Sequence, residues 1–288
     1  MYELALFAGS GGGILGGKIL GWRTVCAVEI NSYCQKILMQ RQDDGIIEAF
    51  PIWDDVKTFG SETSECKDII QTISNLDNVI ITAGFPCQPY STVGKKLGSK
   101  DERNLWPDTL RIIREVVPKF VLLENVPRLI QFNYFGKIIG DLAESGYDAE
   151  WDIISAAGVD APHIRRRLWI LGWQTKNRNT IKTTTKSEFG VCRTLKFSRP
   201  SDVSGLGEIT KEWPDSKLEW WGKDPANIIP GKESIYARDC WGIESRMDRV
   251  VDGMANRVDR CEAIGNGQVP IVVAVAFTKL AERAGILS

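Results

Sequence analysis

The sequence predicts an α/β protein: a Rossmann-like, mostly parallel sheet with helices on both faces, together with a small irregular domain. Three observations predict it. Short apolar runs alternate with stretches of helical period, a glycine cluster directly follows the first run, and the composition changes near Trp173. In such sheets ligands bind beyond the carboxyl ends of the strands, so we expect the chemistry immediately after each apolar run.

The apolar runs are short and bounded by turn residues or charges, as expected for buried strands. The stretches between them place apolar residues at helical spacing. The predicted strands are Leu4–Ala8, Thr24–Glu29, Val79–Ala83, Lys119–Glu124, Ile153–Ala156 and Leu168–Gly172. The predicted helices include Ser32–Arg41, Leu105–Val117 and a final helix, Val269–Arg283, that is apolar enough to pack back onto the sheet.

Charge divides the chain into two predicted domains. Between Trp173 and Pro200 there are seven Lys or Arg residues and a single acid, Glu188, and the balance then turns acidic up to Cys240. We therefore assign residues 1–173 and 258–288 to one domain and 174–257 to a second. The whole chain has a formal net charge of −1, which excludes a uniformly basic nucleic-acid binder but allows a local basic patch.

Cysteine usage and hydropathy indicate the compartment. Seven cysteines without a CxxC pair and a single histidine, His163, argue against a disulfide framework and a zinc site, so no metal is expected. The longest apolar run, Val269 to Phe277, is too short to span a bilayer, and the start of the chain lacks a basic segment typical of secretion signals. We expect a soluble cytoplasmic protein that does not contact membranes.

A glycine loop and a following acid favour a nucleotide-like ligand. The loop contains Phe7, Gly9, Ser10, Gly11 and Gly12 after the first predicted strand. Glycines permit a tight turn and a close approach of ligand to backbone, although such turns also occur for packing alone.

Glu29 ends the second predicted strand, 18 residues after Gly11, where an acid can accept hydrogen bonds from ribose hydroxyls or else cap a helix. Together with the loop it favours an adenosine-containing cofactor. No GK[ST] follows the glycines, which disfavours phosphate-driven ATP chemistry. Asp54 and Asp55 are candidates for holding an adenine amino group or for a plain turn.

Cys87 and Glu124 are the candidate reactive residues. Cys87 stands between Pro86 and Gln88-Pro89, where the prolines hold it in a defined pose after the third strand. This position favours a nucleophile, whose thiolate would need a positive local field. Glu124 ends the fourth strand and would lie near Cys87 if the two strands are neighbours. A carboxyl there suits proton delivery, or else is a satisfied strand-end acid.

Three successive arginines precede the apolar run Leu168–Leu171. Strand alternation places Arg165 and Arg167 on one face and Arg166 on the other. Two guanidiniums on one face can bind a phosphate or carboxylate by paired hydrogen bonds. The alternative is a basic edge strand that discourages aggregation.

These motifs resemble one family. FAGSGGG, VEI, GFPCQPYS, ENV, IRRRLW and AIGNGQVP, in that order, are similar to DNA cytosine-5 methyltransferases of the compact bacterial and phage type. The resemblance covers roughly residues 3–173 and 258–285. It implies S-adenosylmethionine as cofactor, with S-adenosylhomocysteine as product, and double-stranded DNA as partner.

The resemblance also implies roles for individual residues. The cofactor would be bound by Phe7, Gly9, Ser10, Gly11, Gly12, Glu29, Asp55, Pro86 and Asn266. Cys87 would add to carbon 6 of a flipped-out cytosine, Glu124 would contact ring nitrogen 3, and Arg165 and Arg167 would support Glu124. Ser91, Lys95 and Lys96 would lie in a mobile loop that contacts DNA, and Lys182 and Lys186 in a target-recognition domain formed by 174–257.

Several alternatives stay open at this point. An RNA (tRNA) cytosine-5 methyltransferase of similar fold is one rival, and a catalytically silent DNA-binding regulator is another. His163 stands where the family usually has Gln, which allows a general-base role for it. A cognate restriction endonuclease is a candidate partner, and a monomer is the expected state.

Overall fold

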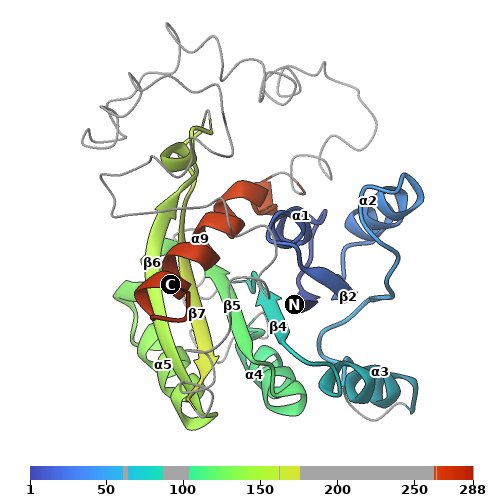
Figure 1. Cartoon of the computed structure of the whole chain (residues 1–288), viewed down its shortest axis with the longest axis horizontal. Helices are drawn as coiled ribbons and strands as arrows, with labels where there is room; N and C mark the ends of the chain where they lie inside the picture. The colour runs from blue at the N-terminus through green and yellow to red at the C-terminus, as the bar shows by residue number, and fades with distance from the viewer. Residues whose placement is uncertain (61–63, 87–103, 162, 176–262, 264, 288) are drawn as a thin grey trace, which may run out of the picture.

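The computed structural model describes residues 1–60, 64–86, 104–161, 163–175, 263 and 265–287 (Figure 1). Within this part of the chain a seven-stranded sheet has the order β3-β2-β1-β4-β5-β7-β6. The five strands from β3 to β5 in this order are parallel to one another, and β7 runs antiparallel to both β5 and β6. The strands are β1 Tyr2–Leu6, β2 Arg23–Val28, β3 Ile52–Trp53, β4 Val79–Ala83, β5 Phe120–Asn125, β6 Tyr147–Ser155 and β7 Arg166–Gln174.

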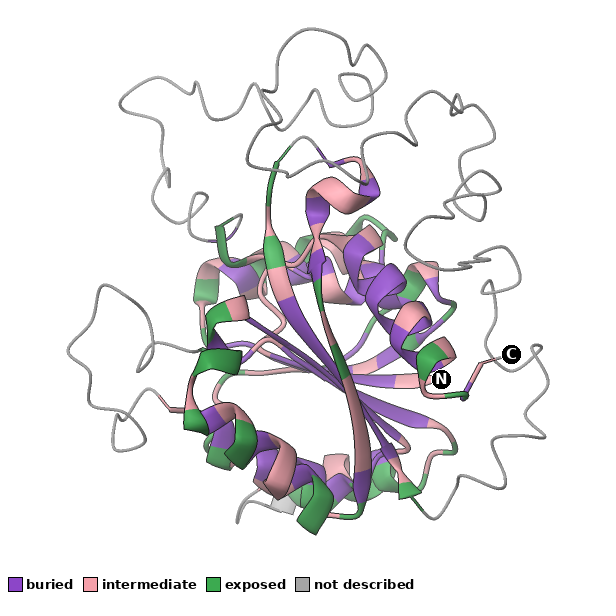
Figure 2. Ribbon diagram, turned by 90° about the vertical axis from the view of Figure 1, so that its left-hand side faces the viewer, coloured by how far each residue is buried: buried purple, intermediate pink, exposed green. Residues whose placement is uncertain are grey.

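Helices cover both faces of the sheet, so the fold class predicted from the sequence is confirmed. Figure 2 shows buried strands between helices whose outer sides are exposed. One face packs against α1 (Gly12–Ile19), α2 (Ser32–Asp43) and α9 (Pro270–Arg283). The other packs against α3 (Ser64–Ser74), α4 (Trp106–Val116) and α5 (Asn133–Glu144). A parallel sheet buried on both faces explains why its strands are nearly continuous apolar runs.

The final helix packs back onto the sheet as predicted. Phe277 of α9 makes edge-to-face contacts with Trp22 and Phe120, with ring centroids 4.9 Å and 6.0 Å apart. Pro270 occupies the first turn of the helix, where its missing N–H costs no hydrogen bond. The segment immediately before this helix is thereby held against the sheet edge where the candidate site lies.

One predicted strand had the wrong limits. The sequence predicted a strand at Ile153–Ala156, but β6 begins at Tyr147 and ends at Ser155, and Ala156 begins a short 3₁₀ helix, Ala156–Val159. The first half of β6 alternates acidic and apolar residues and is only partly buried, because it lies at the edge of the sheet. A search for continuous apolar runs misses such a strand.

A carboxyl group is buried in the middle of the sheet. Glu3 of β1 is fully buried, and Thr24 of β2 and Thr82 of β4 each donate a hydrogen bond to it, at 2.7 Å and 2.8 Å. Burial raises the pKa of Glu3, and the two hydroxyls offset only part of that effect. The folded state therefore favours the protonated carboxyl.

This burial predicts a pH-dependent stability. As pH rises above the ordinary carboxyl pKa, the unfolded chain releases the Glu3 proton first, so the free energy of unfolding falls by up to about 1.4 kcal/mol per pH unit until the raised pKa is passed. Glu3→Gln removes this loss and should be more stable than the wild type at pH 8, with the difference shrinking toward pH 4. Urea unfolding across that range measures it. Glu48→Gln, at an exposed residue, is the control; parallel curves for wild type and Glu3→Gln would contradict the prediction.

Candidate active site

The site lies at the carboxyl edge of the sheet. β1 leads into Phe7, β2 into Glu29 and β4 into Gly84, while Glu124 lies at the end of β5. β7 is antiparallel and therefore begins at the same edge, where Arg166 follows Arg165. Topology thus gathers residues from five strands that are far apart in the sequence.

β4 and β5 are neighbours, which is the condition under which Glu124 was predicted to lie near residue 87. The pairing of Ala83 with Leu123 places Gly84 beside Glu124. Asn125 donates a hydrogen bond of 3.1 Å to the carbonyl of Phe85, which ties the exit of β4 to the end of β5. Pro86 is exposed and ends this described segment. Cys87 lies outside the described residues, as do Ser91, Lys95, Lys96, Lys182, Lys186 and nearly all of the predicted domain 174–257.

The glycine loop is a tight turn tied to the end of β2. Phe7, Gly9 and Gly11 all have positive φ, of 55°, 55° and 88°. Gly9 N donates a 2.6 Å hydrogen bond to one oxygen of Glu29, and Asn31 N donates one of 2.7 Å to the other. No atom lies within 4 Å of the position that a Gly9 side chain would occupy, so the turn borders open space.

Glu29 is not the helix cap that the sequence left open as an alternative. The side chain of Asn31 caps α2 by accepting hydrogen bonds from Tyr33 N and Cys34 N. Glu29 instead joins the loop after β1 to the loop after β2, and is 8% exposed. Its two oxygens keep further lone pairs with which to accept hydrogen bonds.

Both aspartates after β3 take part in a turn. Asp54 Oδ1 accepts a hydrogen bond from Asp55 N at 2.8 Å, and Asp55 Oδ1 accepts one from Lys57 N at 2.9 Å. Both residues therefore stabilise the turn, and adenine binding by Asp55 stays a prediction. Asp55 is half-buried and Asp54 is exposed, so Asp55 is the better-placed of the two for a ligand.

Glu124 is a buried acid held by two arginines. It is 8% exposed, and its Oε1 lies 2.8 Å from Arg167 Nε, an ionic contact in which that oxygen has no well-aligned hydrogen-bond donor among the described residues. Burial raises the pKa of Glu124, opposed by the positive charges of Arg167 and Arg165. The carboxyl is therefore placed to hold a proton at a higher pH than an ordinary Glu.

Arg165 and Arg167 both act electrostatically on Glu124, in agreement with their predicted position on one face, although Arg165 lies just before the strand. Arg165 donates a 2.6 Å hydrogen bond to the carbonyl of Gly265 and its pKa is lowered by burial and by the neighbouring Arg167. The edge-strand alternative is wrong, because β7 lies between β5 and β6. Two positive charges around one buried carboxyl give this corner a positive field.

Sequence reasoning did not single out Gln268. Its side-chain amide is hydrogen-bonded to Glu124 and lowers the pKa of that carboxyl. A Cβ on Gly84 would lie 3.1 Å from Gln268 Nε2, and one on Gly13 would lie 2.4 Å from Gln268 Oε1. Gln268 thus contacts the start of α1, the end of β4 and the buried acid together. The signal was present in the GNGQV motif, from which only Asn266, an exposed residue here, was selected.

None of the helices in the described residue ranges is long and apolar enough to cross a membrane. No group of three or more His, Cys, Asp or Glu side chains suited to a metal ion occurs within the same ranges.

Comparison with known proteins identifies the family. The model of a family described as C-5 cytosine-specific DNA methylase matches residues 1–216. The chain belongs to this family. Among named relatives, the Type II methyltransferase M.PspPI of Psychrobacter is 34% identical over 225 residues, covering 74% of this chain and 50% of its own. M.NgoMIV of Neisseria gonorrhoeae, also a Type II methyltransferase, is 32% identical over 184 residues, covering 62% and 54%.

This C-5 cytosine methylase chain spans about half the length of those relatives. Two solved structures are similar in fold. The Entamoeba histolytica methyltransferase EhMeth has a TM-score of 0.56 at 17% identity, covering 99% of this chain and 98% of its own. The Dnmt2 methyltransferase of S. pombe has a TM-score of 0.54 at 17% identity, covering 99% of both.

Gly12 provides a test of how the site is assembled. A Cβ there would lie 2.0 Å from the backbone oxygen of Gln268, so the absence of a side chain lets the segment before α9 approach α1. We expect Gly12→Ala to lower the free energy of unfolding by about 1–3 kcal/mol, as overpacking against backbone does.

Thermal or urea unfolding measures this effect. Gly136→Ala, in α5, is the matched control, because nothing lies within 4 Å of the added methyl group and alanine favours the helix. If both variants were equally stable, the proposed close approach at Gly12 would be wrong.

Proposed function

We propose that this chain transfers a methyl group from S-adenosylmethionine to carbon 5 of a flipped-out cytosine in a short duplex DNA sequence, through a covalent adduct between Cys87 and cytosine carbon 6. The observation that carries the proposal is Glu124, a buried acid between Arg165 and Arg167, beside the strand end that leads into Cys87. Membership of the C-5 cytosine methylase family supports the same chemistry.

The glycine loop fits the cofactor. The turn at Gly9 and Gly11 borders open space, and Glu29 beside it keeps lone pairs for ribose hydroxyls. Phe7, Gly9, Ser10, Gly11, Gly12, Glu29, Asp55, Pro86 and Asn266 are the residues proposed to hold it. Bound there, S-adenosylmethionine supplies a methyl group on a positively charged sulfur.

The protein's own groups make cytosine reactive. Carbon 5 of cytosine is a poor nucleophile, so the Cys87 thiolate first bonds to carbon 6. Glu124 donates its proton toward ring nitrogen 3 and so stabilises the charge that this addition creates. Carbon 5 then takes the methyl group and loses its proton to a base, and elimination breaks the sulfur–carbon 6 bond and frees Cys87.

The electrostatics of the corner agree with both steps. The raised pKa of Glu124 lets the carboxyl keep its proton to a higher pH than an ordinary glutamate does. With Glu124 protonated, Arg165 and Arg167 leave a net positive field, which favours a thiolate nearby. Arg167 also orients the carboxyl through the 2.8 Å contact to Oε1, leaving Oε2 toward Gly84.

Duplex DNA is the proposed substrate, and the target base must leave the helix to reach the site. Ser91, Lys95 and Lys96 are proposed to contact it from the loop after Cys87, and Lys182 and Lys186 from the domain 174–257. A tRNA cytosine methyltransferase is the second candidate, and methyl transfer to duplex DNA and to tRNA, measured side by side, distinguishes the two.

We further propose that the chain acts as a cytoplasmic monomer. We also propose a cognate restriction endonuclease as its partner, which the Type II names of its relatives suggest.

Trapping tests the nucleophile. Duplex DNA carrying 5-fluorocytosine at the target site should form a covalent adduct with the protein in the presence of cofactor, because fluorine cannot leave carbon 5 as a proton. Cys87→Ser should form no adduct and transfer no methyl groups, yet bind DNA and cofactor. A denaturing gel and a tritium-transfer assay measure both. Methyl transfer by Cys87→Ser at the wild-type rate would refute the assignment.

The pH profile tests Glu124. Since the protonated carboxyl is the active form, kcat should fall as pH rises through the raised pKa of Glu124. Glu124→Gln, which holds no transferable proton, should lower kcat by about 10²- to 10⁴-fold and lose that descending limb. Single-turnover rates between pH 6 and 9 measure this, with DNA binding followed separately. A descending limb that persists in Glu124→Gln would mean that another group titrates.

A further inference from the structure

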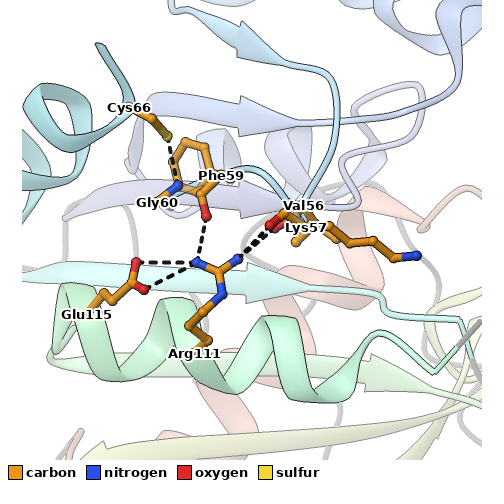
Figure 3. Close-up of polar contacts among 7 residues, drawn as sticks. All are labelled: Val56, Lys57, Phe59, Gly60, Cys66, Arg111 and Glu115. Atoms are coloured by element: carbon orange, nitrogen blue, oxygen red, sulfur yellow. Dashed lines mark hydrogen bonds and ion pairs between the residues drawn. The ribbon is translucent and has the colours of Figure 1, made fainter. Parts of the chain in front are cut away.

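A side chain of α4 holds the turn that carries Asp55 (Figure 3). Arg111 Nη1 donates a hydrogen bond to the carbonyl of Phe59 at 2.7 Å. Its Nη2 donates to the carbonyls of Val56 at 3.0 Å and Lys57 at 3.3 Å. One planar guanidinium therefore binds three backbone carbonyls of a single turn, which its rigid fork of donors allows.

The turn leaves those carbonyls for Arg111 to bind. Thr58 N and Phe59 N both donate to the carbonyl of Asp55, at 3.1 Å and 3.0 Å, and Lys57 N donates to its carboxylate. The carbonyl and Oδ1 of Asp55 are thus used within the turn, whereas the carbonyls of Val56, Lys57 and Phe59 accept hydrogen bonds from Arg111 on α4. The turn is therefore held in two ways: its own backbone N–H groups donate to Asp55, and Arg111 of α4 donates to its carbonyls.

Apolar side chains of the turn pack into the core, whereas its backbone carbonyls are bound by Arg111. Val56 and Phe59 are buried, and the Phe59 ring lies 6.1 Å from that of Trp53. The turn closes at Gly60, whose φ is +85° and whose N–H donates to Cys66 Sγ at 2.8 Å.

Space around Gly60 is tight. An added Cβ would lie 2.3 Å from a carboxylate oxygen of Glu115 and 3.1 Å from Arg111 Nη1. Glu115 also forms an ion pair of 3.2 Å with Arg111, which keeps the guanidinium in place. Small changes at residue 111 are therefore transmitted to the turn rather than absorbed by empty space.

We propose that Arg111 is a positioning residue for adenine recognition: it sets the Asp55 turn so that this carboxylate accepts the 6-amino group of the purine. The inference rests on the proposed function, which assigns Asp55 to the adenine of the cofactor. A carboxylate accepts a hydrogen bond from an amino group and repels a carbonyl oxygen. Arg111 thereby makes the site selective for a 6-aminopurine over a 6-oxopurine.

Two ligands that differ in the group on carbon 6, and in the N1–H that accompanies a 6-oxo group, test the proposal. Isothermal titration calorimetry compares S-adenosylhomocysteine with S-inosylhomocysteine, its 6-oxo analogue. The wild type should bind the first at least about tenfold more tightly, as expected for a hydrogen bond to a charged group. Arg111→Met should weaken binding of S-adenosylhomocysteine by about tenfold while changing the affinity for the inosine analogue by less than about twofold.

Matched variants separate positioning from stability. Arg114 lies on the same helix but donates to Ser145 Oγ at 3.0 Å, so Arg114→Met should keep the wild-type preference. Asp55→Ala should abolish the preference in the wild type and add nothing in Arg111→Met, as a double-mutant cycle requires. Melting temperatures and far-ultraviolet circular dichroism confirm folding. If Arg111→Met does not fold, Arg111→Lys, with a single ammonium group, should give an intermediate preference.

The outcomes distinguish the inference from the function on which it rests. An unchanged preference in a folded Arg111 variant, or equal weakening of both ligands, overturns the positioning role. A wild type that binds both ligands equally also overturns it, while leaving the methyltransferase function intact. A wild type that binds neither ligand overturns the cofactor assignment and the inference together.

Discussion

The contact between Glu124 and Arg167 is the interaction on which the candidate site depends. A carboxyl buried at the end of a parallel strand would ordinarily be costly, because burial removes its hydration. Here β7 enters the sheet antiparallel to β5, so its first residues meet the last residues of β5 and place a guanidinium 2.8 Å from the acid. The antiparallel direction of β7 thus provides the positive charge that offsets the cost of burying Glu124.

The region around Glu124 also depends on a close approach between two backbone segments, the start of α1 and the segment before α9. Gly12 admits the backbone of Gln268, whose side chain then extends past Gly84 to Glu124. The loop proposed to hold the cofactor and the acid proposed to contact the base therefore share one neighbour. The sequence allowed two explanations of the glycine cluster, packing and ligand binding. Gly12 serves packing, because it admits the backbone of Gln268, whereas Gly9 borders open space.

The proposed adenine-binding turn is held by a helix on the face of the sheet opposite to α1 and α9. Arg111 belongs to α4, which packs on the same face of the sheet as α3 and α5, whereas α1 and α9 cover the other face (Figure 1). The turn after β3 passes over the carboxyl edge and is held there by carbonyl contacts to that helix. Helices from both faces of the sheet thus hold loops at its carboxyl edge, in addition to covering the sheet.

The sequence alone determined the fold class, most strand positions and the residue types of the site, since buried strands and their terminal motifs are local patterns. It also selected Glu29 and Glu124, because residues that end parallel strands share an edge, and Arg165 and Arg167, because strand alternation places them on one face. Only the tertiary structure decided that β7 lies inside the sheet and that β6 starts at Tyr147. It also decided that Gln268 contacts Glu124 and that Arg111 binds the turn after β3. Those facts depend on contacts between segments far apart in the chain, and a local pattern carries no information about which distant backbone a side chain will meet.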